Sequence, residues 1–214
     1  MKQAADFATN WGKLVGQEYG LRDNIKLVTT LPNQDTNGLH CDNLITVFNR
    51  QFWLSHNTRL QKGGVEPVYL PADARVSCHR IIFTRDYFSS ALHEIAHWCV
   101  AGAKRRLQID YGYWYAADGR SAEQQRLFEQ VEVKPQALEW IFSQAAGHGF
   151  RASADNLEAG IGPSAAFKRS VHQQVLDYCS VGLPARAAAF TGALAVHYGR
   201  PSPLAAQYYQ LASL

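Results

Sequence analysis

The sequence has few charged residues, no strong excess of charge of one sign, and no long hydrophobic run. Its 214 residues include 21 Lys and Arg against 18 Asp and Glu, a formal net charge of +3, and charged residues make up 18% of the chain. So low a charged fraction argues against a disordered chain or a charge-rich tail. So small a net charge does not indicate direct binding of nucleic acid, which normally needs a clustered basic face.

Segments that would direct the chain to or across a membrane are also missing. A membrane-spanning helix needs roughly 18 or more consecutive apolar residues. The longest candidate, residues 187–196, is shorter and is interrupted by Thr191 and Gly192. Residues 1–6 include the polar or charged Lys2, Gln3 and Asp6, where a secretory signal has an apolar run. The sequence therefore predicts a cytoplasmic protein without a membrane partner.

The cysteines form neither a disulfide framework nor a zinc ribbon. They are far apart and none belongs to a C-x-x-C pair: Cys41, Cys78, Cys99 and Cys179. In a chain of this size, such isolated cysteines are typical of buried, reduced thiols in a cytoplasmic protein.

Hydrophobic residues make up 47% of the chain, which is enough to bury one sizeable core. Apolar residues recur at helical spacing through most of the sequence, whereas strand and turn signals concentrate in residues 55–87. Helices are expected at about 42–54, 89–101, 121–142, 165–180 and 184–199. The predicted fold class is therefore α+β, a mostly helical single domain with a small β component.

Two features mark breaks in this pattern. Residues 31–39 collect Pro, Asn, Asp and Gly without periodicity, which is typical of a linker. We therefore predict an N-terminal extension of unknown role over residues 1–40 and a main domain over residues 41–214. Inside the long helix expected over residues 121–142, Pro135 cannot donate a backbone hydrogen bond, so the helix should kink there or restart near Lys134.

The strongest chemical signal is the segment HEIAH at residues 93–97. On a helix, positions i and i+4 lie one above the other, so His93 and His97 can present two imidazoles to one metal ion. Glu94 is one position along and close enough to act as a base on a metal-bound water. The segment therefore predicts a metal site with Glu94 as its catalytic residue.

Two histidines leave a metal ion short of protein ligands, so a third ligand is expected downstream. Residues 99–104 contain no histidine, which excludes the metzincin arrangement and favours a carboxylate. The next long helix offers Glu129, Glu132 and Glu139. We predict Glu132, because it precedes Pro135, where the backbone can be re-aimed. Glu129 is the alternative and would otherwise be an outer partner, whereas Glu139 best fits an exposed helix glutamate.

This set of ligands allows two kinds of chemistry. Two histidines and a carboxylate hold Zn²⁺ in hydrolases, where a glutamate such as Glu94 activates the bound water. The same set is the facial triad of non-haem Fe(II) oxygenases, which leaves positions open for O₂ and substrate. The spacing does not separate the two, and on the bare motif a zinc hydrolase is the larger class.

Further motifs accompany the histidine segment in a fixed order. They comprise residues 66–74, 91–99 with 101–102, 111–115 with 118–120, 131–138 and 155–158. Together they resemble the bacterial elongation factor P hydroxylase family. The resemblance runs from about residue 42 to about residue 200 and does not include the predicted extension.

The resemblance implies a function, a partner and a metal site. Members of that family hydroxylate a lysine of elongation factor P that already carries a β-lysyl group, and their fold resembles zinc metallopeptidases. It implies a zincin-like core, with a divalent metal ion bound by His93, His97 and Glu132. Iron is expected, although zinc or another divalent ion can occupy such a site in purified protein. The alternative is a zinc metallopeptidase that uses the same motif.

Two other segments are candidates for binding the ammonium groups of such a substrate. The aromatic residues 111–115 offer rings for cation–π contact, and Glu158 offers a carboxylate. An aromatic loop that packs on the core explains the first equally well, and turn chemistry explains the segment around the second.

Overall fold

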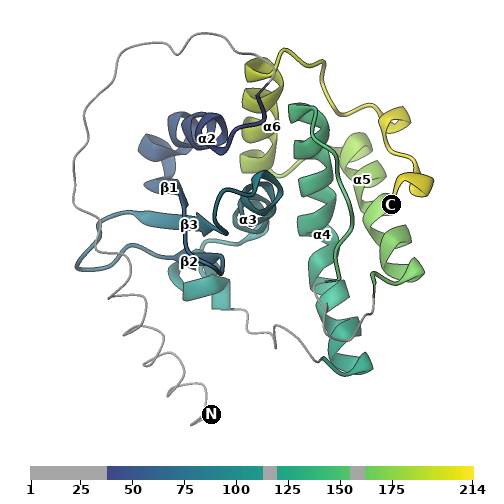
Figure 1. Ribbon diagram of the computed structural model, residues 1–214, viewed down its shortest axis with the longest axis horizontal. Helices are drawn as coiled ribbons and strands as arrows, with labels where there is room; N and C mark the ends of the chain where they lie inside the picture. The colour runs from purple at the N-terminus through teal and green to yellow at the C-terminus, as the bar shows by residue number, and fades with distance from the viewer. Residues whose placement is uncertain (1–37, 113–119, 155–161) are drawn as a thin grey trace. The chain divides into compact units, whose positions relative to one another are not determined.

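A computed structural model describes residues 38–112, 120–154 and 162–214 (Figure 1). The chain from Thr36 to Leu214 forms one compact unit. Most of the predicted extension over residues 1–40 lies outside the described residues. So do residues 113–119, which include much of the aromatic segment, and Glu158.

The described part is mostly helical with one small sheet, as the α+β fold class predicts. The main elements are α2 (Cys41–His56), β1 (Thr58–Lys62), β2 (Val68–Leu70), β3 (His79–Phe83), α3 (Phe88–Val100), α4 (Ala122–Ala146), α5 (Ala165–Val181) and α6 (Ala185–His197). Short 3₁₀ helices are η1 (Arg105–Leu107), η2 (Ile109–Gly112), η3 (Ala206–Tyr208) and η4 (Leu211–Ser213). Each long helix lies within a few residues of its predicted range.

The three strands form one sheet in the order β1-β3-β2, in which β3 is parallel to β1 and antiparallel to β2. Ile81 at its centre pairs with Leu60 on one side and Tyr69 on the other, and all three side chains are buried. Helix α2 contacts β1, and α3 contacts β3. The helix that carries the histidine motif therefore rests on the sheet.

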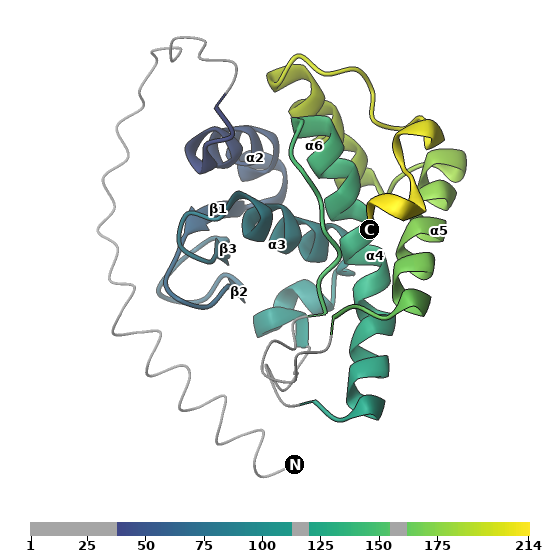
Figure 2. The ribbon, with the colours of Figure 1, turned by 45° about the vertical axis from the view of Figure 1, so that its right-hand side comes forward.

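Helix α3 lies between the sheet and the helices α4 and α6 (Figure 2). Trp98 of α3 is fully buried and packs edge-on against Phe48 and Phe52 of α2, with ring centroids 5.3 and 4.7 Å away. The other buried side chains of α3 recur at helical spacing: Phe88, Ala91, Leu92, Ile95, Ala96 and Cys99. This apolar packing fixes α3 and directs His93 and His97 toward α4.

Helix α4 begins with a capping box, in which Ser121 and Gln124 each bond to the other's backbone N–H. It runs uninterrupted through Pro135, so the predicted restart near Lys134 is wrong. The proline removes one backbone hydrogen bond, but Pro135 and the three residues after it are buried. Tertiary packing of this segment outweighs the local loss.

The C-terminal end of α3 is held by arginines from outside the helix. Nη2 of Arg186, on α6, lies 3.0 Å from the carbonyl oxygens of Trp98 and Cys99 and 2.6 Å from that of Ala101. Nη1 of Arg106 donates to the same Ala101 oxygen at 2.6 Å. Both cations satisfy carbonyls that the helix leaves unpaired, at the end where positive charge is favourable.

Replacing Arg186 with methionine should lower the free energy of unfolding by about 2 kcal/mol, because it removes charge-assisted hydrogen bonds to helix-end carbonyls but keeps an apolar side chain. Urea unfolding monitored by circular dichroism measures the change. The control is Arg50→Met, since Arg50 is an exposed residue of α2. Equal stability of both variants would show that Arg186 does not hold α3.

The cysteines are free thiols, with Cys41, Cys78 and Cys99 buried and Cys179 partly exposed. Burial raises the pKa of Cys41 to about 12 and that of Cys99 further. The prediction of buried, reduced thiols is confirmed for the first three.

In the described ranges, no single helix is both long and apolar enough to cross a membrane. Helices α5 and α6 meet that criterion only as a pair, and they are bent by 87° at the break between them.

Candidate metal centre

The two histidines of the motif lie one turn apart on the face of α3 that meets α4. Their Nε2 atoms are 3.0 Å apart, with the ring planes inclined at 72°. The helix thus brings both imidazoles to one point, as the i and i+4 spacing predicts.

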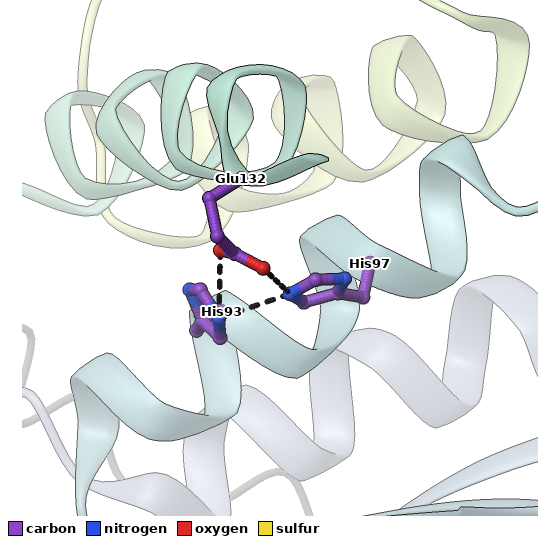
Figure 3. A group of neighbouring side chains, drawn as sticks. All are labelled: His93, His97 and Glu132. Carbon is purple, nitrogen blue, oxygen red and sulfur yellow. Dashed lines mark hydrogen bonds and ion pairs between the residues drawn. The ribbon is translucent and has the colours of Figure 1, made fainter. Parts of the chain in front are cut away.

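Helix α4 contributes Glu132 to the same point (Figure 3). Its Oε1 lies 3.2 Å from Nε2 of His97, and its Oε2 lies 3.5 Å from Nε2 of His93. The side chain of Glu132 is 2% exposed, whereas those of His97 and His93 are 12% and 23% exposed. The cluster is therefore closed on the side of Glu132 and most accessible beside His93.

These three side chains fit a divalent metal ion. Two donors bound to one ion at about 2.1 Å lie about 3.0 Å apart when the angle between them is about 90°, and about 3.4 Å apart in a tetrahedral site. The two Nε2 atoms are 3.0 Å apart, and each lies 3.2 or 3.5 Å from one of the two carboxylate oxygens of Glu132, which is close to that spacing. Oε2 of Glu132 is buried without a hydrogen bond. A cation at the point that the three donors share would satisfy that oxygen and both imidazole nitrogens.

Glu132 carries its charge throughout the ordinary pH range. Burial alone would raise the pKa of its carboxyl, but the facing imidazoles of His97 and His93 outweigh burial and lower the pKa to about 2. An ionised carboxylate is the form that binds a metal ion.

Glu139 contradicts its prediction as an exposed helix glutamate. It is only 8% exposed, and its Oε2 lies 2.8 Å from Nδ1 of His93. Charged side chains are rarely buried unless paired, and His93 supplies the pairing. Glu132 and Glu139 are seven residues apart, two turns of helix, so both face α3. This seven-residue spacing is the feature of the sequence that relates Glu139 to Glu132.

The alternative ligand Glu129 lies elsewhere. Its carboxylate accepts hydrogen bonds from the backbone N–H and the hydroxyl of Ser164, at 3.0 and 2.7 Å, next to the start of α5. Among the described residues, no hydrogen bond or ion pair joins Glu129 to His93 or His97. The prediction that it would support the site as an outer partner is therefore wrong.

Glu94 lies beside the ligands but has no hydrogen bond to any residue in the described part of the chain. Burial raises the pKa of its carboxyl, while His93 and His97 oppose that change. The geometry does not test its predicted catalytic role.

Tyr111, which belongs to the aromatic segment singled out in the sequence, is buried beside the site. Its buried ring stacks on Tyr69 with centroids 4.3 Å apart, and lies parallel to the ring of His97 with centroids 6.4 Å apart. Asp110 and Tyr111 adopt φ values of 49° and 58°, a conformation rare for such residues and concentrated at functional sites. A side-chain oxygen of Asp110 accepts a hydrogen bond from the Tyr69 N–H at 2.9 Å, which anchors this segment to β2.

Two comparisons with known proteins point to one family. Residues 47–209 match the family described as elongation factor P hydroxylase. The chain is also similar to the elongation factor P lysine hydroxylase of Haemophilus influenzae, with 54% identity over 157 residues, which cover 73% of this chain and 88% of that protein. The part that matches the family contains all three converging side chains.

Proposed function

The chain belongs to the elongation factor P hydroxylase family, and we propose that it hydroxylates a lysine side chain of elongation factor P. The match to the family over residues 47–209 carries this proposal, because it includes the metal-binding geometry. The substrate is the lysine that already bears a β-lysyl group. Neither comparison supports the zinc metallopeptidase that the histidine motif alone also predicts, since both name hydroxylases.

His93, His97 and Glu132 are the proposed metal ligands, with iron as the working metal. Bound iron would supply the redox chemistry needed to hydroxylate an unactivated C–H bond, which side chains alone cannot perform. The three side chains would hold such an ion, which would have further positions for O₂ and substrate, as in other sites with two histidines and a carboxylate. The greater exposure of His93 marks the side from which a long lysyl side chain would enter.

The domain that performs this reaction spans residues 41–214, and its core is of the zincin type. In support, α3 rests on a small mixed sheet and presents two histidines, while a later helix supplies a glutamate. A cytoplasmic location follows from the substrate, a factor that acts in translation.

Elongation factor P from cells that carry the gene should be heavier by one oxygen atom on its modified lysine than the factor from cells that lack it. Intact-protein and peptide mass spectrometry measures this difference directly. Complementation with the His93→Ala, His97→Ala double variant is the control and should not restore the oxygen. Identical masses with and without the gene would contradict the proposed function.

Glu94 is the proposed catalytic residue, because it lies beside the ligands on α3 and no hydrogen bond within the described ranges occupies its carboxylate. Replacing Glu94 with glutamine keeps the shape of the side chain but removes its charge and its capacity to accept a proton. Hydroxylation should fall by about 100-fold or more, the usual effect of losing a group that transfers protons. Metal affinity should change little, since Glu94 is not one of the converging donors.

Single-turnover rates and metal affinity, measured on the same preparation of Glu94→Gln, separate the two effects. A normal rate would rule out the catalytic role. Loss of metal together with loss of rate would instead make Glu94 part of the metal site.

A further inference from the structure

We propose that Glu139 is a positioning residue of the metal centre: its carboxylate holds His93 in the tautomer whose Nε2 faces Glu132 and His97, and thereby strengthens metal binding. The inference rests on the proposed role of His93, His97 and Glu132 as metal ligands. It assigns a function to a buried carboxylate that the proposed reaction does not otherwise use.

His93 contacts α4 through both of its ring nitrogens. Nε2 lies 3.5 Å from Oε2 of Glu132, and Nδ1 lies 2.8 Å from Oε2 of Glu139. The two glutamates are separated by about 10 Å along the axis of α4. Two residues of α4 therefore hold the imidazole, one through each ring nitrogen.

The contact with Glu139 selects one protonation form of the ring. An ionised carboxylate only accepts hydrogen bonds, so Nδ1 of His93 must carry the proton and donate it. The neutral ring then has its lone pair on Nε2, the atom that faces the other donors. A carboxylate on the far nitrogen of a metal-binding histidine also makes the ring a stronger donor, and removal of such partners typically weakens metal binding 10- to 100-fold.

The second histidine lacks this support. Among the described residues no carboxylate bonds to Nδ1 of His97, whose ring lies instead parallel to that of Tyr111. The orientation of His97 therefore depends on packing, whereas that of His93 depends on a charged hydrogen bond. This asymmetry predicts that Glu139 acts on the metal site specifically through His93.

Zinc affinity of the full chain, measured by competition with a chelator of known affinity, tests the proposal. Glu139→Ala should weaken zinc binding 10- to 100-fold. Glu139→Gln should weaken it less, because the amide oxygen still accepts the hydrogen bond from Nδ1 but carries no charge. Glu129→Gln is the matched control, since Glu129 is a buried carboxylate of the same helix that bonds to Ser164, and it should bind zinc as the wild type does.

A spectroscopic signature distinguishes positioning from a general structural role. In zinc-loaded, ¹⁵N-histidine-labelled protein, the Nδ1–H proton of His93 should give a downfield resonance that exchanges slowly with solvent. The resonance should persist in Glu129→Gln and be lost or shifted upfield in Glu139→Ala. Should the alanine variant fail to fold, the glutamine variant decides: zinc binding weaker than in the wild type together with an upfield shift of the resonance would support the proposal, because a neutral acceptor makes a weaker hydrogen bond.

Wild-type zinc affinity and an unchanged resonance in the Glu139 variants would overturn the proposal. That failure is distinct from failure of the proposed function, because zinc binding needs no elongation factor P. A protein that binds zinc as described but leaves elongation factor P unmodified would retain the role of Glu139 and lose the hydroxylase assignment.

Discussion

Replacing Glu132 with alanine is expected to abolish hydroxylation of elongation factor P. In the part of the chain that the structure describes, Glu132 is the carboxylate that meets both histidines, and its side chain is 2% exposed. Its burial leaves solvent little access to the position that its carboxylate occupies. Metal affinity should therefore fall by more than the about 100-fold expected for loss of an outer partner. Chelator competition and mass spectrometry of the substrate measure the two losses.

Glu129→Ala is the control for this variant. It removes a carboxylate from the same helix, three residues earlier, whose partner is Ser164 rather than a histidine. It should cost some stability where α4 meets α5 but leave metal affinity unchanged. If Glu132→Ala binds metal normally and Glu129→Ala does not, the third ligand is Glu129 and the arrangement of α4 described above is wrong.

The parts of the site that could be predicted from the sequence are those that depend on local helix geometry. His93 and His97 meet because residues four apart always share a face of a helix, and the structure places them together as expected. For the third ligand, the sequence offers three candidate glutamates on one helix, and helix geometry alone does not select Glu132. The structure brings it, and not Glu129, to the two histidines.

The parts that could not be predicted depend on contacts between distant segments. The spacing of Glu132 and Glu139 places both on one face of α4, but which nitrogen of His93 each carboxylate contacts follows from how α4 packs on α3. Arg186 reaches the end of α3 from 85 or more positions along the chain. Asp110 and Tyr111 adopt a left-handed backbone. Because neither residue is a glycine, the sequence does not indicate this conformation. Each of these features depends on packing between segments that are distant in the sequence.

The proposed reaction and the bare histidine motif make opposite predictions about the metal. Zn²⁺ has no redox chemistry, so a zinc-loaded hydroxylase should bind its substrate and leave it unmodified. Protein stripped of metal and reloaded anaerobically with Fe²⁺ should regain hydroxylation on exposure to O₂ and a reductant. A zinc metallopeptidase would behave in the reverse way, active with zinc and indifferent to O₂.

Isotope labelling makes this comparison decisive. In a monooxygenase reaction one atom of O₂ enters the C–H bond and the other leaves as water, so two electrons and two protons must be supplied. With ¹⁸O₂, the hydroxyl group formed on elongation factor P should carry ¹⁸O, whereas labelled water should leave no label. Hydroxylation by the zinc-loaded protein would exclude the redox role of the metal. Label taken from water would exclude oxygen transfer from O₂, even if His93, His97 and Glu132 bind the ion as proposed.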